Sequence, residues 1–167
     1  LPREVAEIPP GQKVILVTTH RRENLGEPLR RIYSALRLLL ADFPDLWVVF
    51  PVHRNPLVWK TAEEVLGDLS RVRLLAPLEY GPFVALMRRA DLVLTDSGGI
   101  QEEAPALGKP VLVLRDTTER PEAVRAGTVR LVGLDREKIR AEVRRLFLDE
   151  AAYREMAQAV NPYGDGR

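Results

Sequence analysis

The stretch LTDSGGIQEEAPALGKPVLVLRDTTERPEA, residues 94–123, decides the fold. It begins at the end of an apolar run over residues 92–95, passes two adjacent glycines, and continues with a helical pattern over residues 100–107. A second apolar run covers residues 111–114, and another helix is expected over residues 121–126. Short apolar strands that alternate with helices are typical of parallel βαβ units, so this segment predicts an α/β domain.

The same alternation extends in both directions from this segment. The sequence predicts further strands over residues 14–18, 46–50, 72–75 and 129–132. Helices are expected over residues 28–43, 57–66 and 83–89, with a helical tail over residues 136–160 in two pieces. Crossovers between parallel strands are right-handed, which gives a Rossmann-like, doubly wound parallel sheet with helices on both faces. Ligands of such sheets bind at the carboxyl ends of the strands.

Length and proline content indicate one domain with a short leader. A chain of 167 residues suits a single compact domain with its own core. Residues 1–12 are rich in proline, so we expect them to form an exposed linker before a domain over residues 13–167.

Composition excludes several classes of protein. The chain has 25 basic and 24 acidic side chains, and this balance argues against nucleic acid as a partner. It has no cysteine, no apolar stretch long enough to span a membrane and no signal-peptide pattern, so we expect a cytoplasmic protein. Arginine greatly outnumbers lysine, which fits either a heat-adapted source or GC-rich codon usage.

The loop after the run over residues 92–95 carries the clearest chemical signal. Ser97, Gly98 and Gly99 lead directly into a helix, where a hydroxyl and exposed backbone N–H groups form an anion site for a phosphate. Glu102 or Glu103 then offers two carboxylate oxygens to neighbouring ribose hydroxyls. The alternative is a tight turn whose glutamates only complement the helix dipole. The loop matches neither a Walker A motif nor a GxGxxG fingerprint.

A second loop, TTHRREN over residues 18–24, follows the first predicted strand. It places His20 beside Arg21 and Arg22, a group that suits a diphosphate leaving group, because cations stabilise the charge that develops on its oxygens. His20 is also a candidate proton donor. Salt bridges among Arg21, Arg22 and Glu23 are the alternative interpretation.

Two weaker signals follow other strands. Arg120 lies in a loop after residues 111–114 and is able to bind a phosphate or a sugar hydroxyl, while Thr117 or Thr118 is a candidate cap for the next helix. His53 follows the second strand, where a lone histidine is more often structural. With two histidines and no cysteine, we expect no metal site.

Together, the segments THRREN, PVHRNP, EYGPF, residues 94–123 and NPYGDG resemble the carboxy-terminal domain of non-hydrolysing UDP-N-acetylglucosamine 2-epimerases. The resemblance implies one half of a two-domain glycosyltransferase-B-like fold, with a UDP-sugar held between the halves. It also implies an isomerase without a cofactor, which serves cell-envelope polysaccharide synthesis. This enzyme converts UDP-N-acetylglucosamine to UDP-N-acetylmannosamine by eliminating UDP and adding it back.

The resemblance also assigns roles to individual residues. His20 is implied to be catalytic and Arg120 to contact substrate, while Arg21 and His53 match a regulatory site for a second substrate molecule. Substrate-binding roles are further implied for Leu78 and Phe83 at the uracil, Ser97, Gly98 and Gly99 at the phosphates, and Glu103 at the ribose. Leu78 is expected to act through its backbone, because its side chain has no polar atom.

In the family, the carboxylates that act on the C2 proton belong to an amino-terminal domain, and a further helix follows NPYGDG. We therefore expect this chain to be a fragment that binds UDP weakly, does not turn over substrate alone, and forms a homodimer as the full-length protein. Three alternatives stay open: a hydrolysing 2-epimerase, the donor domain of a UDP-sugar glycosyltransferase, and a non-catalytic nucleotide-sugar sensor. The HRREN segment speaks against the glycosyltransferase, and a sensor has no need of His20.

Overall fold

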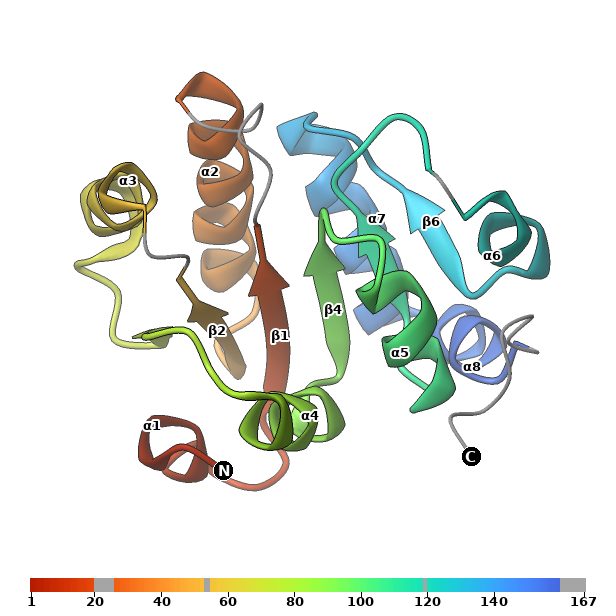
Figure 1. Cartoon of the computed structure of the whole chain (residues 1–167), viewed down its shortest axis with the longest axis horizontal. Helices are drawn as coiled ribbons and strands as arrows, with labels where there is room; N and C mark the ends of the chain where they lie inside the picture. Colours follow the sequence, from red (N-terminus) through yellow and green to blue (C-terminus); the bar gives the residue numbers. More distant parts are fainter. Residues whose placement is uncertain (20–25, 53–54, 119, 160–167) are drawn as a thin grey trace.

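The computed structural model describes residues 1–19, 26–52, 55–118 and 120–159 of the chain (Figure 1). Within these residues, six parallel strands form one sheet in the order β3-β2-β1-β4-β5-β6. The strands are β1 (Lys13–Thr18), β2 (Leu46–Pro51), β3 (Val72–Leu75), β4 (Leu92–Thr95), β5 (Val111–Val113) and β6 (Val129–Leu131). The predicted doubly wound parallel sheet is confirmed.

Within the described residues, one helix lies between each pair of consecutive strands, α1 precedes the first strand, and two helices follow the last strand. The helices are α1 (Arg3–Ala6), α2 (Glu27–Asp42), α3 (Pro56–Leu66), α4 (Tyr80–Arg89), α5 (Ile100–Ala106), α6 (Pro121–Ala126), α7 (Arg136–Leu148) and α8 (Glu150–Ala157). No helix in the described part of the chain is long and apolar enough to cross a membrane.

The helix boundaries follow from local sequence. Asn55 caps α3 by accepting a hydrogen bond from the Leu57 N–H, and Asp135 caps α7 in the same way. Asp149 ends α7 and caps α8, which explains why the predicted tail breaks into two helices. The helix α4 begins three residues earlier than residue 83, because Pro82 falls in its first turn, where an N–H is not needed.

Each face of the sheet carries its own apolar core. Along β1, Ile15 and Val17 pack with α2, α3 and α7, whereas Val14 and Leu16 pack with α1, α4, α5 and α6. This alternation is the period of two that a strand buried on both faces requires. In Figure 1, α5 lies in front of the sheet and α7 lies behind it.

Residues 1–12 depart from the expectation of an exposed linker. They contain the short helix α1, and the side chains of Val5 and Ile8 are only 1% and 4% exposed. Both pack in the core on the α4 and α5 side of the sheet. Apolar side chains near the first strand gain free energy by covering that core, which proline content alone does not reveal.

The order of the strands reverses between β1 and β4. The chain moves outward from β1 to β2 and β3, then returns to β4 and continues to β5 and β6 (Figure 1). The helix that follows β1 is α2 and the helix that follows β4 is α5. These two helices cover opposite faces of the sheet, since they belong to different cores. A crevice outside the carboxyl ends of the strands forms at such a switch point, so the site is expected there.

A partly buried ion pair holds α7 against α2. The guanidinium of Arg140 binds both carboxylate oxygens of Asp42, at 2.8 and 2.7 Å, and Arg144 approaches the same carboxylate at 3.3 Å. The Asp42 side chain is 12% exposed. Its hydrogen bond with Arg140 holds the pKa of the Asp42 carboxyl below its usual range.

We predict that Asp42→Asn lowers the free energy of unfolding by about 1–2 kcal/mol at pH 7, because it removes the charge that two arginines share. A depressed carboxyl pKa stabilises the folded state fully above about pH 4, and this contribution is lost as the pH falls through the folded pKa. Urea unfolding should show a smaller gap between variant and wild type at pH 3 than at pH 7. The exposed pair of Asp68 with Arg37 provides the control, and Asp68→Asn should change stability much less.

Candidate functional site

The two central strands are joined at their carboxyl ends by a buried contact. The hydroxyls of Thr18 on β1 and Thr95 on β4 lie 2.5 Å apart, and both side chains are at most 1% exposed. Thr95 Oγ1 also accepts a hydrogen bond of 3.0 Å from the Ser97 N–H. The start of the turn at residues 97–99 is therefore anchored at the switch point of the sheet.

The turn itself has room on its outer side. Gly99 is the N-cap residue of α5 and has helical backbone angles, φ −63° and ψ −36°. No side chain caps this helix. A Cβ added to Gly99 would have its nearest neighbours 4.0 Å away, at Glu103 and Ser97. Neither backbone conformation nor packing among the described residues thus requires glycine at this position, and the open space beside it would let a ligand approach the backbone closely.

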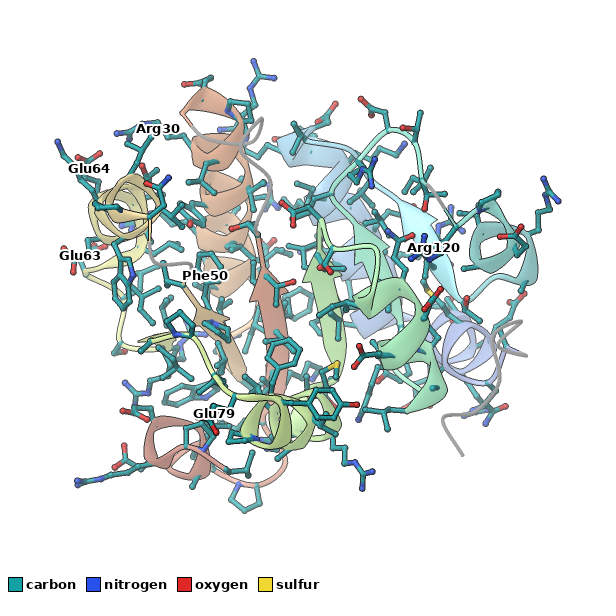
Figure 2. All side chains as sticks on the ribbon, in the orientation of Figure 1. Arg30, Phe50, Glu63, Glu64, Glu79 and Arg120 are labelled. Atoms are coloured by element: carbon teal, nitrogen blue, oxygen red, sulfur yellow. The ribbon has the colours of Figure 1, made fainter. Side chains whose placement is uncertain are left out.

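The arginine loop, defined here as residues 115–118 together with Arg120, lies beside this turn. Arg120 Nε donates to Glu102 Oε1 over 2.8 Å, and the two side chains are 29% and 39% exposed. Arg120 extends between α5 and α6 (Figure 2). Glu102 is thus engaged by the arginine, while Glu103, the predicted ribose ligand, is exposed one residue further along α5.

The predicted capping role of Thr117 or Thr118 is wrong. Arg120 occupies the N-cap position of α6, and no side chain caps that helix. Thr118 Oγ1 instead accepts a hydrogen bond of 2.9 Å from the Arg120 N–H, which shapes the loop before the helix begins.

A mostly apolar cavity of about 280 Å³ opens next to the turn. It is lined by both residues predicted to hold the uracil, Leu78 and Phe83, and by Ile100 at the start of α5. Its other lining residues, Thr18, Pro51, Pro77 and Tyr80, were not among the predicted site residues. Tyr80 stands at the rim with 72% of its surface exposed. An apolar cavity that adjoins a polar turn suits a ligand with a flat ring at one end.

Several site predictions lie outside the described residues. They concern His20, Arg21, His53 and the NPYGDG segment. Tyr33 on α2 is fully buried, and this burial raises the pKa of its phenol well above the ordinary value, with the hydroxyl of Thr19 opposing the shift. The phenol is therefore neutral at physiological pH. Among the described residues, no group of three acidic or histidine side chains could hold a metal ion.

Three polar residues of the site, Gln101, Thr18 and Thr95, were not among the predicted site residues. Gln101 is fully buried between the turn and the arginine loop, and it accepts a hydrogen bond of 2.6 Å from Thr118 Oγ1. A glutamine in a helix gives no sign in the sequence of whether it faces solvent or the interior. Thr18 and Thr95 carried a weak signal, because each is the last residue of a predicted strand.

The observed fold is that of a Rossmann-like α/β domain, with an apolar cavity at the carboxyl ends of its strands, beside the switch point where such domains bind ligands. The sequence profile of the family described as UDP-N-acetylglucosamine 2-epimerase matches residues 2–167. The chain therefore belongs to the UDP-N-acetylglucosamine 2-epimerase family.

Individual relatives agree with this assignment. The UDP-N-acetylglucosamine 2-epimerase of Escherichia coli (strain K12) is 57% identical over 160 residues, which are 96% of this chain and 43% of that protein. The crystal structure of UDP-GlcNAc 2-epimerase from Neisseria meningitidis, bound to UDP-GlcNAc, matches with a TM-score of 0.89 and 51% identity, over 93% of this chain and 42% of that one. The chain thus spans less than half the length of these relatives.

The fold also occurs in a glycosyltransferase. The carboxy-terminal domain of a glycosyl transferase group 1 family protein from Francisella tularensis superposes with a TM-score of 0.71 at 17% identity, over 90% of this chain and 82% of that one. This likeness concerns the fold alone, and it agrees with the predicted glycosyltransferase-B-like architecture.

The structure predicts different consequences for two glycine substitutions. Gly99→Ala should change the free energy of unfolding by no more than about 1 kcal/mol, because its Cβ has space and its backbone is ordinary. Gly133→Ala should cost about 1–2 kcal/mol or more, because Gly133 has φ +61° and its Cβ would collide with the Asp116 carboxylate. Thermal unfolding of both variants measures the difference. Equal destabilisation would mean that Gly99 serves the fold and not a ligand.

Proposed function

We propose that this chain is the nucleotide-sugar-binding half of a non-hydrolysing UDP-N-acetylglucosamine 2-epimerase. The observation that carries the proposal is the arrangement of three features along one sheet edge in a member of this family. The apolar cavity, the turn at residues 97–99 and the arginine loop follow one another there. A nucleoside diphosphate has the same polarity, with a flat base at one end and charged phosphates at the other. The Neisseria meningitidis relative is described as bound to UDP-GlcNAc, which supports the same ligand class.

Each part of UDP has a matching group. The uracil enters the cavity between Leu78 and Phe83, and the exposed carboxylate of Glu103 accepts hydrogen bonds from the ribose hydroxyls. The Ser97 hydroxyl and the amides of Gly98 and Gly99 bind the phosphates. Arg120 adds a positive charge beside the turn, and the phosphates compete with Glu102 for it.

These groups assist the reaction by stabilising its leaving group. Elimination removes the proton from C2 and breaks the bond between C1 and the diphosphate oxygen, which leaves a 2-acetamidoglucal and UDP. Return of a proton to the opposite face of C2 and of UDP to C1 then completes the inversion, without oxidation or reduction. Arg120 and the turn stabilise the charge on the departing diphosphate, and His20 is proposed to supply a proton near it.

The acid and base that act at C2 are proposed to lie in an amino-terminal domain, which fits the 43% of the Escherichia coli relative that this chain covers. The domain boundary at residue 13, the regulatory roles of Arg21 and His53, the cytoplasmic location and the homodimer stay predictions.

Products distinguish the alternatives. A hydrolysing 2-epimerase releases free N-acetylmannosamine and UDP, and a glycosyltransferase needs an acceptor. A sensor tolerates His20→Ala without loss of function.

We predict that this chain binds UDP saturably, and that Arg120→Ala weakens binding about 10- to 100-fold by removing a charge-assisted hydrogen bond. Gly99→Ala should also weaken binding, although its stability is nearly unchanged. Arg125→Ala is the matched control, because Arg125 is an exposed arginine on α6 and should not affect UDP. Calorimetric titration measures the dissociation constants. Equal affinities of the Arg120→Ala and Arg125→Ala variants would contradict the proposed phosphate site.

We also predict that the chain alone does not interconvert UDP-N-acetylglucosamine and UDP-N-acetylmannosamine, because the groups that act at C2 are supplied by another domain. Incubation in deuterated water tests the first step directly, since reversible removal of the C2 proton incorporates deuterium at C2. Incorporation at a rate comparable to that of a complete epimerase would place the acid and base within these 167 residues.

A further inference from the structure

We propose that Gln101 is a positioning residue that sets the geometry between the turn at residues 97–99 and the arginine loop. This inference rests on the proposed function, in which both segments bind the diphosphate of UDP. It assigns a task in UDP binding to the buried Gln101 side chain, although Gln101 itself is not proposed to contact UDP.

The side-chain amide of Gln101 bridges the two segments. Its Oε1 accepts a hydrogen bond of 2.6 Å from Thr118 Oγ1, and its Nε2 donates one of 3.4 Å to the carbonyl oxygen of Ser97. Gln101 is 0% exposed, so its amide cannot turn to bulk water and depends on these two bonds.

The donor and acceptor groups available at each atom fix the direction of every hydrogen bond in this series. Thr118 Oγ1 accepts from the Arg120 N–H at 2.9 Å, which leaves its own proton for Gln101 Oε1. The Ser97 carbonyl can only accept, so the Gln101 amide nitrogen must face it. A continuous polar path therefore runs from the backbone of Arg120 to the backbone of Ser97.

Ser97 is held from inside the protein at both of its backbone groups. Its N–H is bound by Thr95, and its C=O is bound by Gln101. Arg120 is likewise held at two points, through its backbone by Thr118 and through its guanidinium by Glu102. Glu102 and Gln101 are neighbours on α5, so one helix positions both segments.

A ligand that bridges two segments benefits when their separation is set before it binds, because it then does not have to order them. Loss of the Gln101 amide removes the hydrogen bond that ties Thr118 to α5 and leaves the partly exposed ion pair of Arg120 with Glu102. Affinity for UDP should fall, even where the fold is kept.

A set of variants separates positioning from folding. Gln101→Leu and Thr118→Val each remove one partner, whereas Thr118→Ser keeps the hydroxyl. The double variant removes both partners, so less of the buried polar surface is left unpaired and stability should partly recover. Thr128→Val is the control, since Thr128 is a buried threonine whose hydroxyl donates to the Ala123 carbonyl over 3.1 Å, at the end of α6 away from the turn.

Calorimetry with UDP and thermal unfolding are measured on the same proteins. We expect Gln101→Leu and Thr118→Val each to weaken UDP binding roughly 10-fold, and the double variant to be no weaker than either single one, because all three break one path. Thr118→Ser should stay within about 2-fold of wild type, as a conservative replacement. Thr128→Val should lose stability but not affinity. Affinities that follow stability across the set, or a double variant that binds as well as wild type, would overturn the proposal.

Failure of the proposed function gives a different result. If the folded wild-type chain does not bind UDP, the UDP site on this chain is refuted, and Gln101 is judged from the free protein alone. Amide hydrogen exchange at residues 97–99 then decides. Faster exchange in Gln101→Leu, with wild-type rates in Thr128→Val, supports positioning of the turn, whereas unchanged rates in both variants refute it.

Discussion

The pairing of β1 with β4 is the constraint on which the rest of the structure depends. These two strands come far apart in the sequence, yet Thr18 and Thr95 are partners in register, and their hydroxyls meet at the carboxyl end. Because α2 and α5 leave this pair toward opposite faces, the backbone separates above it and creates the crevice. Both cores, the cavity and the turn are arranged around this one junction.

The site combines a rigid interior with an accessible edge. Below the turn, Thr95 and Gln101 are fully buried and bind the backbone of Ser97. Above it, Gly99 leaves space, and the side chains of Arg120 and Glu102 are partly exposed. Electrostatic binding is strongest where dipoles and charges are already oriented, so the interior network and the exposed groups act as one unit. The pairing of Arg120 with Glu102 keeps the arginine oriented at modest cost, because a partly exposed ion pair is weak enough to exchange for a phosphate.

The chain is proposed to supply one half of a larger active site. Its family membership and its coverage of 43% of the Escherichia coli relative agree with a domain that binds one face of its ligand. Groups suited to a diphosphate and a flat base gather on this domain, whereas the described residues offer no buried pair of carboxylates at the crevice for work at a carbon–hydrogen bond. In the proposed function, binding and proton transfer are divided between two domains, and closure of the cleft between them would assemble the reactive geometry.

By itself, the sequence determined the class of the fold and the position of nearly every described strand and helix, and it predicted which loops carry chemistry. Apolar periodicity, glycines and caps such as Asn55 and Asp149 are local signals, and parallel topology then brings the loops to one edge. Only the tertiary structure decided that Val5 and Ile8 join the core, that Glu102 binds Arg120, and that Thr118 contacts Gln101 rather than capping α6. These facts depend on which side chains meet across elements. A buried glutamine and an exposed one have the same local pattern, and only the packing of α5 against the arginine loop distinguishes them.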